Sequence, residues 1–155
     1  MHGRFKTLVS TLVESEKPDT LVIISHSQGT VISIEAIKAK ALSCMSNDRC
    51  ALVTMGSPYS HIYQHCFASD FTQPTDFDEH LGSWLNIFRI DDFVGTTVTS
   101  HTTDWPKNEP VNPKGHTGYW TDSEVLTLLR KNVLDEFGET LPNAPEANAT
   151  EKASA

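Results

Sequence analysis

Residues 21–30 read Leu-Val-Ile-Ile-Ser-His-Ser-Gln-Gly-Thr, a β-prone apolar run that ends abruptly in small and polar residues. Four consecutive apolar residues of this kind predict a buried strand over residues 21–24. The apolar residues that follow recur with helical spacing, at Val31, Ile34, Ile37, Ala41, Leu42 and Met45. The segment therefore predicts a strand, a sharp turn and a helix, with Ser27 at the turn.

The turn between this strand and this helix has the residue types that a reactive serine requires. Ser27 must occupy a strained backbone position for its hydroxyl to project from the sheet edge. Small residues at Ser25 and Gly29 let the helix pack close to the strand. The backbone N–H of Gln28 then lies near the helix N-terminus, where negative charge is stabilised. This layout is typical of a nucleophile elbow.

Two later segments carry groups that would complete such a site. Residues 84–90 form another apolar, β-prone run, which ends in two carboxylates, Asp91 and Asp92. Groups at the carboxyl end of a strand lie where open α/β sheets bind their ligands. His116 lies in a glycine-flanked loop just before a predicted helix. The chain thus presents a serine, an acid and a histidine in that order.

The elbow and this order of residues resemble the α/β-hydrolases, the fold of esterases, lipases and many acyl-transfer enzymes. The usual Gly-x-Ser-x-Gly is altered by Ser25, a small residue that part of the family also carries there. The acid segment resembles the Asp-Pro-Ile-Gly loop of a bacterial lipase-like branch, with Phe93 in place of proline. This alignment favours Asp92 as the triad acid and keeps Asp91 as the alternative. The resemblance covers residues 1–140.

The resemblance implies a serine esterase or lipase-like hydrolase that works through an acyl-enzyme. Ser27 would attack the ester carbonyl, His116 would take and return its proton, and Asp92 would orient the imidazole. The Gln28 N–H would supply one oxyanion donor, and neither a metal nor an organic cofactor is required. An acyltransferase would use the same triad with a different acceptor, and remains an alternative.

Few residues precede the predicted nucleophile strand, whereas a complete α/β-hydrolase has four strands and an oxyanion loop before it. The resemblance therefore implies the C-terminal half of such a domain, with the N-terminal strands absent. Loss of one oxyanion donor typically costs about 2.7–4 kcal/mol, so a non-catalytic remnant or interaction module is a third hypothesis. Residues 21–24 would then lie at an open sheet edge, which we expect a second copy or the missing half to cover.

The remaining patterns predict half of a doubly wound sheet. Residues 51–55 and 84–90 are further apolar strands, and residues 111–114 form a weak fourth strand, which Pro110 and Pro113 limit. The expected fold is a partial α/β-hydrolase fold of three to four mostly parallel strands with flanking helices.

Helices are predicted on both sides of these strands. Residues 1–16 place five apolar side chains on one helical face, namely Phe5, Leu8, Val9, Leu12 and Val13. Thr121 and Glu124 have capping-box spacing at the start of a closing helix. Residues 141–155 are rich in Pro, Asn, Ala and Glu and predict a disordered tail.

The connection over residues 59–83 is rich in aromatic side chains. Such insertions often wall the acyl pocket in the resembled family, so we expect Tyr59 to contact the substrate; local packing over the sheet is the alternative. His26, directly before Ser27, is also expected to contact the substrate. His61 and His65 have the spacing of metal ligands, but neither an acidic partner nor a Cys-x-x-Cys pattern accompanies them. No metal site is predicted.

Length and charge restrict the class of partner. The chain of 155 residues is long enough for one compact domain with a tail, and its net charge is −8. This charge argues against binding to nucleic acid or to anionic membranes, and no segment is apolar for long enough to span a bilayer. Three cysteines without framework spacing indicate a reducing compartment, so a cytoplasmic location is expected. If the chain is part of a longer protein, that protein could carry membrane segments upstream. The expected partner is a small-molecule ester or acyl substrate.

Overall fold

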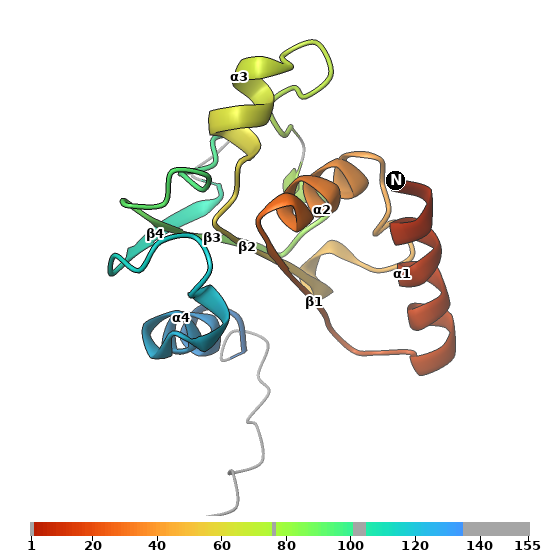
Figure 1. The fold of residues 1–155 in the computed structure, drawn as a ribbon. Coiled ribbons are helices and arrows are strands. Elements are labelled where there is room, and N and C mark those ends of the chain that lie inside the picture. Colours follow the sequence, from red (N-terminus) through yellow and green to blue (C-terminus); the bar gives the residue numbers. More distant parts are fainter. Residues whose placement is uncertain (1, 76, 101–104, 135–155) are drawn as a thin grey trace, which may run out of the picture.

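A four-stranded, all-parallel sheet in the order β1-β2-β3-β4 forms the centre of the molecule, with helices on both faces (Figure 1). The computed structural model describes residues 2–75, 77–100 and 105–134.

The strands are β1 (Leu21–His26), β2 (Cys50–Met55), β3 (Ser83–Arg89) and β4 (Lys107–Val111). The α-helices are α1 (His2–Glu16), α2 (Gln28–Lys38), α3 (Gln64–Cys66) and α4 (Ser123–Leu129). Short 3₁₀ turns cover Asn47–Arg49, Phe77–Glu79 and Tyr119–Thr121, and π turns cover Tyr59–Tyr63 and Arg130–Leu134. The predicted parallel α/β sheet with flanking helices is confirmed.

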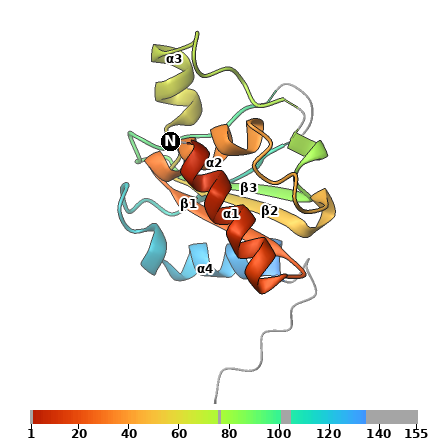
Figure 2. The same ribbon diagram turned by 90° about the vertical axis from the view of Figure 1, so that its right-hand side faces the viewer.

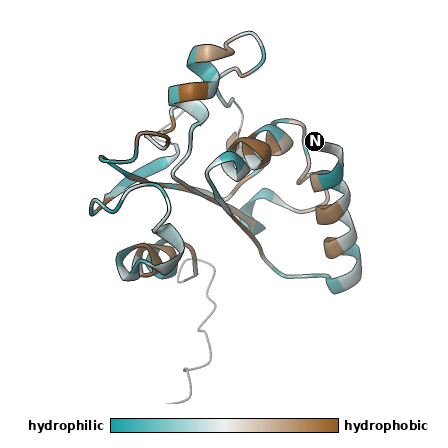
Figure 3. Ribbon diagram, in the orientation of Figure 1, coloured by the Kyte–Doolittle hydropathy of each residue, from teal (hydrophilic) through white to brown (hydrophobic). Residues whose placement is uncertain are grey.

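The two faces of the sheet bury separate clusters of side chains. Leu52 and Trp84 pack under α1 and α2 with Ile34, whereas Val53 packs against α4 with Val125. Figure 2 shows α4 on the opposite side of the sheet from α2, and Figure 3 shows hydrophobic residues along the sheet and in each flanking helix. Consecutive residues of a parallel strand face opposite layers, so a strand covered on both faces must be apolar throughout. This explains why β2 is buried at every position.

The fourth strand lies earlier in the chain than predicted. The sequence favoured residues 111–114, but β4 covers Lys107–Val111 and pairs with β3 from Leu85 to Arg89. Pro110 lies within β4 and is exposed. An edge strand tolerates a missing N–H because one row of its backbone groups faces no neighbouring strand.

Helix α1 forms as predicted but does not bury its whole apolar set. Val9 is buried and Phe5 and Val13 pack beside it against the core, while Leu8 and Leu12 are exposed. Residues 5, 9 and 13 are each four apart and lie in one row along a helix, whereas residues 8 and 12 form the adjacent row. The apolar stripe of the sequence is therefore wider than the surface that the core offers.

Within the described residues, β1 pairs on one side with β2 and its other side has no neighbouring strand. Ile24 is 41% exposed. An apolar cavity of about 160 Å³ lies on the α4 side of this strand, lined by Val22, Ile24, Leu126, Leu129, Arg130 and Val133. A hydrophobic strand edge of this kind favours pairing with another chain.

Replacing Ile24 with lysine is expected to weaken self-association by about tenfold or more. A charged side chain on an edge strand opposes pairing, because a neighbouring strand would bury the ammonium group. Light scattering over a concentration series measures the effect. Ile90→Lys places the same change at an exposed isoleucine after β3 and is the matched control. A monomeric parent protein at all concentrations would contradict the prediction.

Two expectations fall at the limits of the described chain. The tail predicted over residues 141–155, and the end of the domain predicted at residue 140, lie outside the described residues. Among those that the structure does describe, no helix combines the length and the hydrophobicity needed to cross a membrane.

Candidate active site

Ser27 occupies the turn between β1 and α2 with φ 54° and ψ −129°. A positive φ is uncommon for a residue other than glycine, and such strain persists only where surrounding contacts impose it. The Ser27 N–H donates to the Met55 carbonyl at 3.0 Å, and the Ser27 carbonyl accepts from the Thr30 N–H and hydroxyl at 3.0 and 2.7 Å. The turn is thus held from β2 and from α2, and the Ser27 side chain lies at the carboxyl edge of the sheet.

Ser27, His116 and Asp92 form one hydrogen-bonded chain at this edge. The Ser27 Oγ lies 2.8 Å from His116 Nε2, and His116 Nδ1 lies 2.9 Å from both carboxylate oxygens of Asp92. An ionised carboxylate only accepts hydrogen bonds, so Nδ1 carries the hydrogen. In the neutral imidazole, Nε2 is then the acceptor of the Ser27 O–H.

The structure separates the two candidate acids. Asp92 contacts the imidazole, whereas the exposed Asp91 accepts the Gly115 N–H at 2.9 Å and does not contact the His116 ring. Asp91 therefore holds the backbone of the loop that carries His116.

Asp92 is buried and surrounded by donors. Besides His116, it accepts the N–H groups of Val94 and Gly95 at 2.9 and 3.0 Å and the Tyr119 hydroxyl at 2.9 Å. Burial alone would raise the pKa of the carboxyl, but these hydrogen bonds outweigh it and hold the pKa of Asp92 below its usual range. The lowered pKa stabilises the fold above the unfolded pKa of about 3.9, and this contribution is lost as the pH falls through the lower folded value.

Two glycines make room for the Asp92 turn. Gly56 follows β2 with φ 55°, and a Cβ there would lie 2.9 Å from Asp92 Oδ2. A Cβ on Gly95 would overlap the backbone of Gly56 and lie 2.7 Å from the same oxygen. The close approach of these two backbones therefore depends on the absence of both side chains.

Gly95→Ala is expected to lower the free energy of unfolding by about 1–3 kcal/mol, because an added methyl group in a packed site forces backbone shifts. Urea unfolding followed by circular dichroism measures the loss. Gly3→Ala makes the same substitution in α1, where a Cβ would contact nothing, and is expected to stabilise by about 0.5–1 kcal/mol. Equal stability of the parent and the Gly95 variant would contradict this account of the turn.

The structure places the two predicted substrate contacts differently: Tyr59 is buried, whereas His26 lies beside His116 in the candidate site. Tyr59 is fully buried: its hydroxyl donates to the Glu35 carboxylate, accepts from Lys38 Nζ at 3.1 Å and lies 2.9 Å from the Thr72 carbonyl oxygen. It anchors the segment after β2 to α2 and has no exposed surface with which to contact a substrate. Burial raises the pKa of Tyr59, and the neighbouring Glu35 adds to this effect. His26 is half-buried, and its Nε2 lies 2.8 Å from the His116 carbonyl oxygen.

Gln28 begins α2 directly after Ser27. The first N–H groups of a helix have no partner within the helix, and they point toward the positive end of its dipole. The Gln28 side chain lies 3.4 Å from the Tyr63 hydroxyl. The backbone N–H of Gln28 thus lies beside Ser27 at the positive end of the α2 dipole, where negative charge is favoured.

Several supporting residues were not identified from the sequence. Tyr119 contacts Asp92, and the buried Arg89 lies over the Tyr119 ring at 4.3 Å while its guanidinium pairs with Asp122 at 2.6 Å. Asp122 also caps α4 by accepting the Glu124 N–H at 3.0 Å, so the cap is Asp122 and not the predicted Thr121. Aspartate is a preferred N-cap residue, so Asp122 could have indicated this cap, whereas nothing local marks Arg89 as a buried cation.

Hydrogen bonds from Lys114 and the Glu124 N–H hold the pKa of Asp122 below its usual range, and Arg89 adds to this effect. Asp122 is thus an anion that joins the end of β3 to the start of α4 and to the loop before it. Through Arg89 and Lys114, Asp122 therefore connects β3, which leads into the Asp92 turn, to the loop that carries His116.

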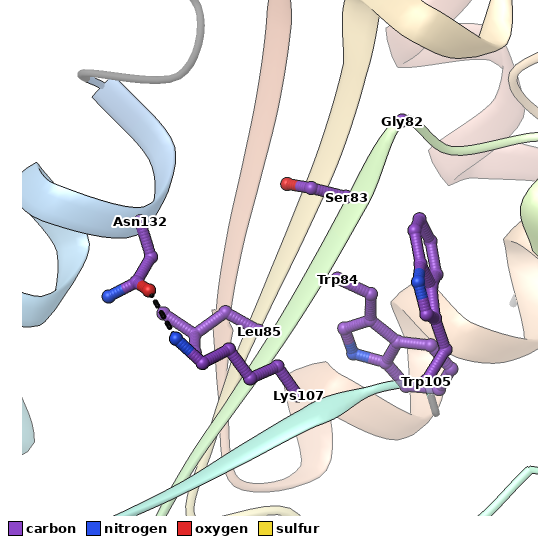
Figure 4. A pocket seen from close by; sticks show the side chains of 7 residues that line it. All are labelled: Gly82, Ser83, Trp84, Leu85, Trp105, Lys107 and Asn132. Carbon is purple, nitrogen blue, oxygen red and sulfur yellow. Dashed lines mark hydrogen bonds between the residues drawn. The ribbon is translucent and has the colours of Figure 1, made fainter. Parts of the chain in front are cut away.

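One cavity lies in another part of the molecule. It has a volume of about 400 Å³ and opens at the amino ends of β3 and β4, opposite to Ser27 (Figure 4). Lys107 and Asn132 both line this cavity, and Lys107 donates to the Asn132 side chain at 2.8 Å. Neither His61 nor His65 belongs to a group of three metal-binding side chains within the described residues.

No protein-family model matches this chain, and a comparison with curated proteins finds no match. A functional assignment therefore depends on the geometry around Ser27.

Proposed function

We propose that this chain carries a serine-hydrolase active site of the α/β-hydrolase type, acting on carboxylic esters. The observation that carries the proposal is the continuous hydrogen-bond chain from Ser27 Oγ through the His116 ring to Asp92. The positive φ of Ser27 at a strand-to-helix turn adds to it, because such a turn presents the hydroxyl to a ligand.

In the proposed reaction, the Ser27 oxygen attacks the ester carbonyl carbon while His116 Nε2 accepts the hydroxyl proton. The tetrahedral adduct then expels the alcohol, which takes that proton from the imidazolium and leaves Ser27 acylated. Water repeats the sequence and releases the acid. The ionised Asp92 keeps the hydrogen on Nδ1 and stabilises the imidazolium.

The negative charge of the adduct requires hydrogen-bond donors beside Ser27. The Gln28 N–H is one, since it begins α2 and the helix dipole favours an anion there. This donor acts mainly in the transition state, because the charge on the carbonyl oxygen develops only during attack.

Exposed apolar side chains near the site favour an acyl group or a lipid-like ester as the substrate. Phe93, directly after Asp92, is 82% exposed and lies edge-on to His61 with ring centroids 6.4 Å apart. Trp120 is 52% exposed and lies 6.4 Å from the His26 ring. Phe93 follows Asp92 and Trp120 lies near His26, so both rings are close to residues of the site and offer an acyl chain an apolar surface.

A fluorophosphonate probe with peptide mapping tests the proposal. The probe phosphonylates an activated serine, and we expect one label per chain, on Ser27. Protein denatured before labelling is the control for non-specific reaction. A folded protein that takes up no label at Ser27 would overturn the proposal. Analysis of ester cleavage with added alcohol then separates hydrolysis from acyl transfer, the alternative that uses the same three residues.

A further inference from the structure

The loop that carries His116 is held at three backbone atoms by side chains from other elements. Asp91 accepts the Gly115 N–H at 2.9 Å, and Arg89 donates to the Gly115 carbonyl at 2.8 Å. His26 Nε2 lies 2.8 Å from the carbonyl oxygen of His116 itself. Two of these contacts come from the end of β3 and the third from the end of β1.

His26 joins the two loops that meet in the candidate site. It directly precedes Ser27, and its ring lies against the His116 ring with centroids 4.8 Å apart and an angle of 33° between the planes. The Tyr119 ring also lies near the His26 ring, with centroids 5.4 Å apart. His26 therefore contacts both the backbone and the ring of His116.

The chemistry of the contact determines where His26 carries its hydrogen. A carbonyl oxygen only accepts, so the hydrogen lies on Nε2 of His26. This hydrogen is thus donated to the His116 carbonyl oxygen.

We propose that His26 is a positioning residue, which holds the His116 imidazole between Ser27 and Asp92 through the His116 carbonyl. This role rests on the proposed function and replaces the substrate contact expected from the sequence. The distance of 2.8 Å between Ser27 Oγ and His116 Nε2 joins two separate loops, and a misplacement of 1 Å in such a site costs about 100-fold in rate. The hydrogen bond from His26 to the His116 carbonyl joins these two loops and limits such a misplacement.

Four variants test whether the hydrogen bond donated by His26 matters, or only the size or polarity of its side chain. His26→Gln places an amide N–H at the position of Nε2, whereas His26→Asn ends one bond short and His26→Phe keeps the ring without a donor. His65→Phe repeats the last change at an exposed position of α3. We expect the Phe and Asn variants to lose about 10- to 100-fold in kcat for ester cleavage, with KM unchanged. The Gln variant is expected to recover most of kcat, and His65→Phe to match the parent.

Nuclear magnetic resonance gives a readout that does not require activity. The His116 Nδ1 proton, bonded to the Asp92 carboxylate, is expected at low field and is assigned by its loss in His116→Gln. This signal should shift or broaden in the Phe and Asn variants and remain in the Gln variant. This pattern of Nδ1 signals could also be found in a protein that fluorophosphonate does not label at Ser27. That combination would overturn the hydrolase function and support the positioning of His116 by His26.

Three outcomes would overturn the positioning role. One is an unchanged Nδ1 signal and kcat in all His26 variants. Another is a change confined to KM, which would return His26 to substrate contact. The third is equal loss in the Gln and Asn variants, which would show that donation at the Nε2 position is irrelevant.

Discussion

Ser27→Ala is expected to abolish fluorophosphonate labelling and to lower ester hydrolysis by as much as about 10⁶-fold. Removal of the hydroxyl leaves His116 and Asp92 without a nucleophile to activate. The fold should survive, because the hydroxyl lies at the sheet edge and bonds to His116, whereas the backbone contacts to Met55 and Thr30 hold the turn. Labelling stoichiometry by mass spectrometry and initial rates with a chromogenic ester measure the two effects.

Ser15→Ala, at an exposed position of α1, is the matched control and should keep full labelling. A thermal unfolding curve for the Ser27 variant that overlays the parent shows that the loss arises from chemistry. Full labelling of the alanine variant would identify a different nucleophile.

Asp92→Asn is expected to slow acylation of Ser27 by about 10⁴-fold, and Asp91→Asn by far less. An amide at position 92 cannot stabilise the imidazolium, and its N–H favours the imidazole tautomer with the hydrogen on Nε2, which cannot accept the serine proton. An amide oxygen at position 91 can still accept the Gly115 N–H. Single-turnover labelling rates measure both variants.

The two substitutions control for each other, since they are adjacent and remove one charge each. The reverse ranking would reassign the acid to Asp91. Equal, small effects in both variants would show that His116 reacts without a carboxylate partner.

Local patterns in the sequence predicted the elements that position the site. Apolar runs marked β1, β2 and β3 because a strand buried on both faces must be apolar at consecutive positions. The change from strand to helical spacing around Ser27 predicted the turn, which the structure confirms with its positive φ. The fourth strand was misplaced because Pro110 counts against a strand locally, whereas an edge strand accepts it.

Contacts between distant residues could not be predicted in the same way. Whether Asp91 or Asp92 meets His116 depends on the path of the turn after β3, which the close approach of Gly56 and Gly95 determines. The burial of Tyr59 depends on α2, where its hydroxyl donates to Glu35 and accepts from Lys38. Such contacts leave no periodic signal in the chain.

The sequence by itself determined the parallel sheet, the strand-turn-helix around Ser27 and the order of serine, acid and histidine, because hydrophobic periodicity and turn chemistry act between near neighbours. The tertiary structure alone decided that Asp92 faces the imidazole, that Arg89 and Asp122 form a buried pair, and that His26 holds the His116 loop. Those pairs are between 24 and 90 positions apart. Strand register and loop path bring them together, and both are properties of the packed molecule.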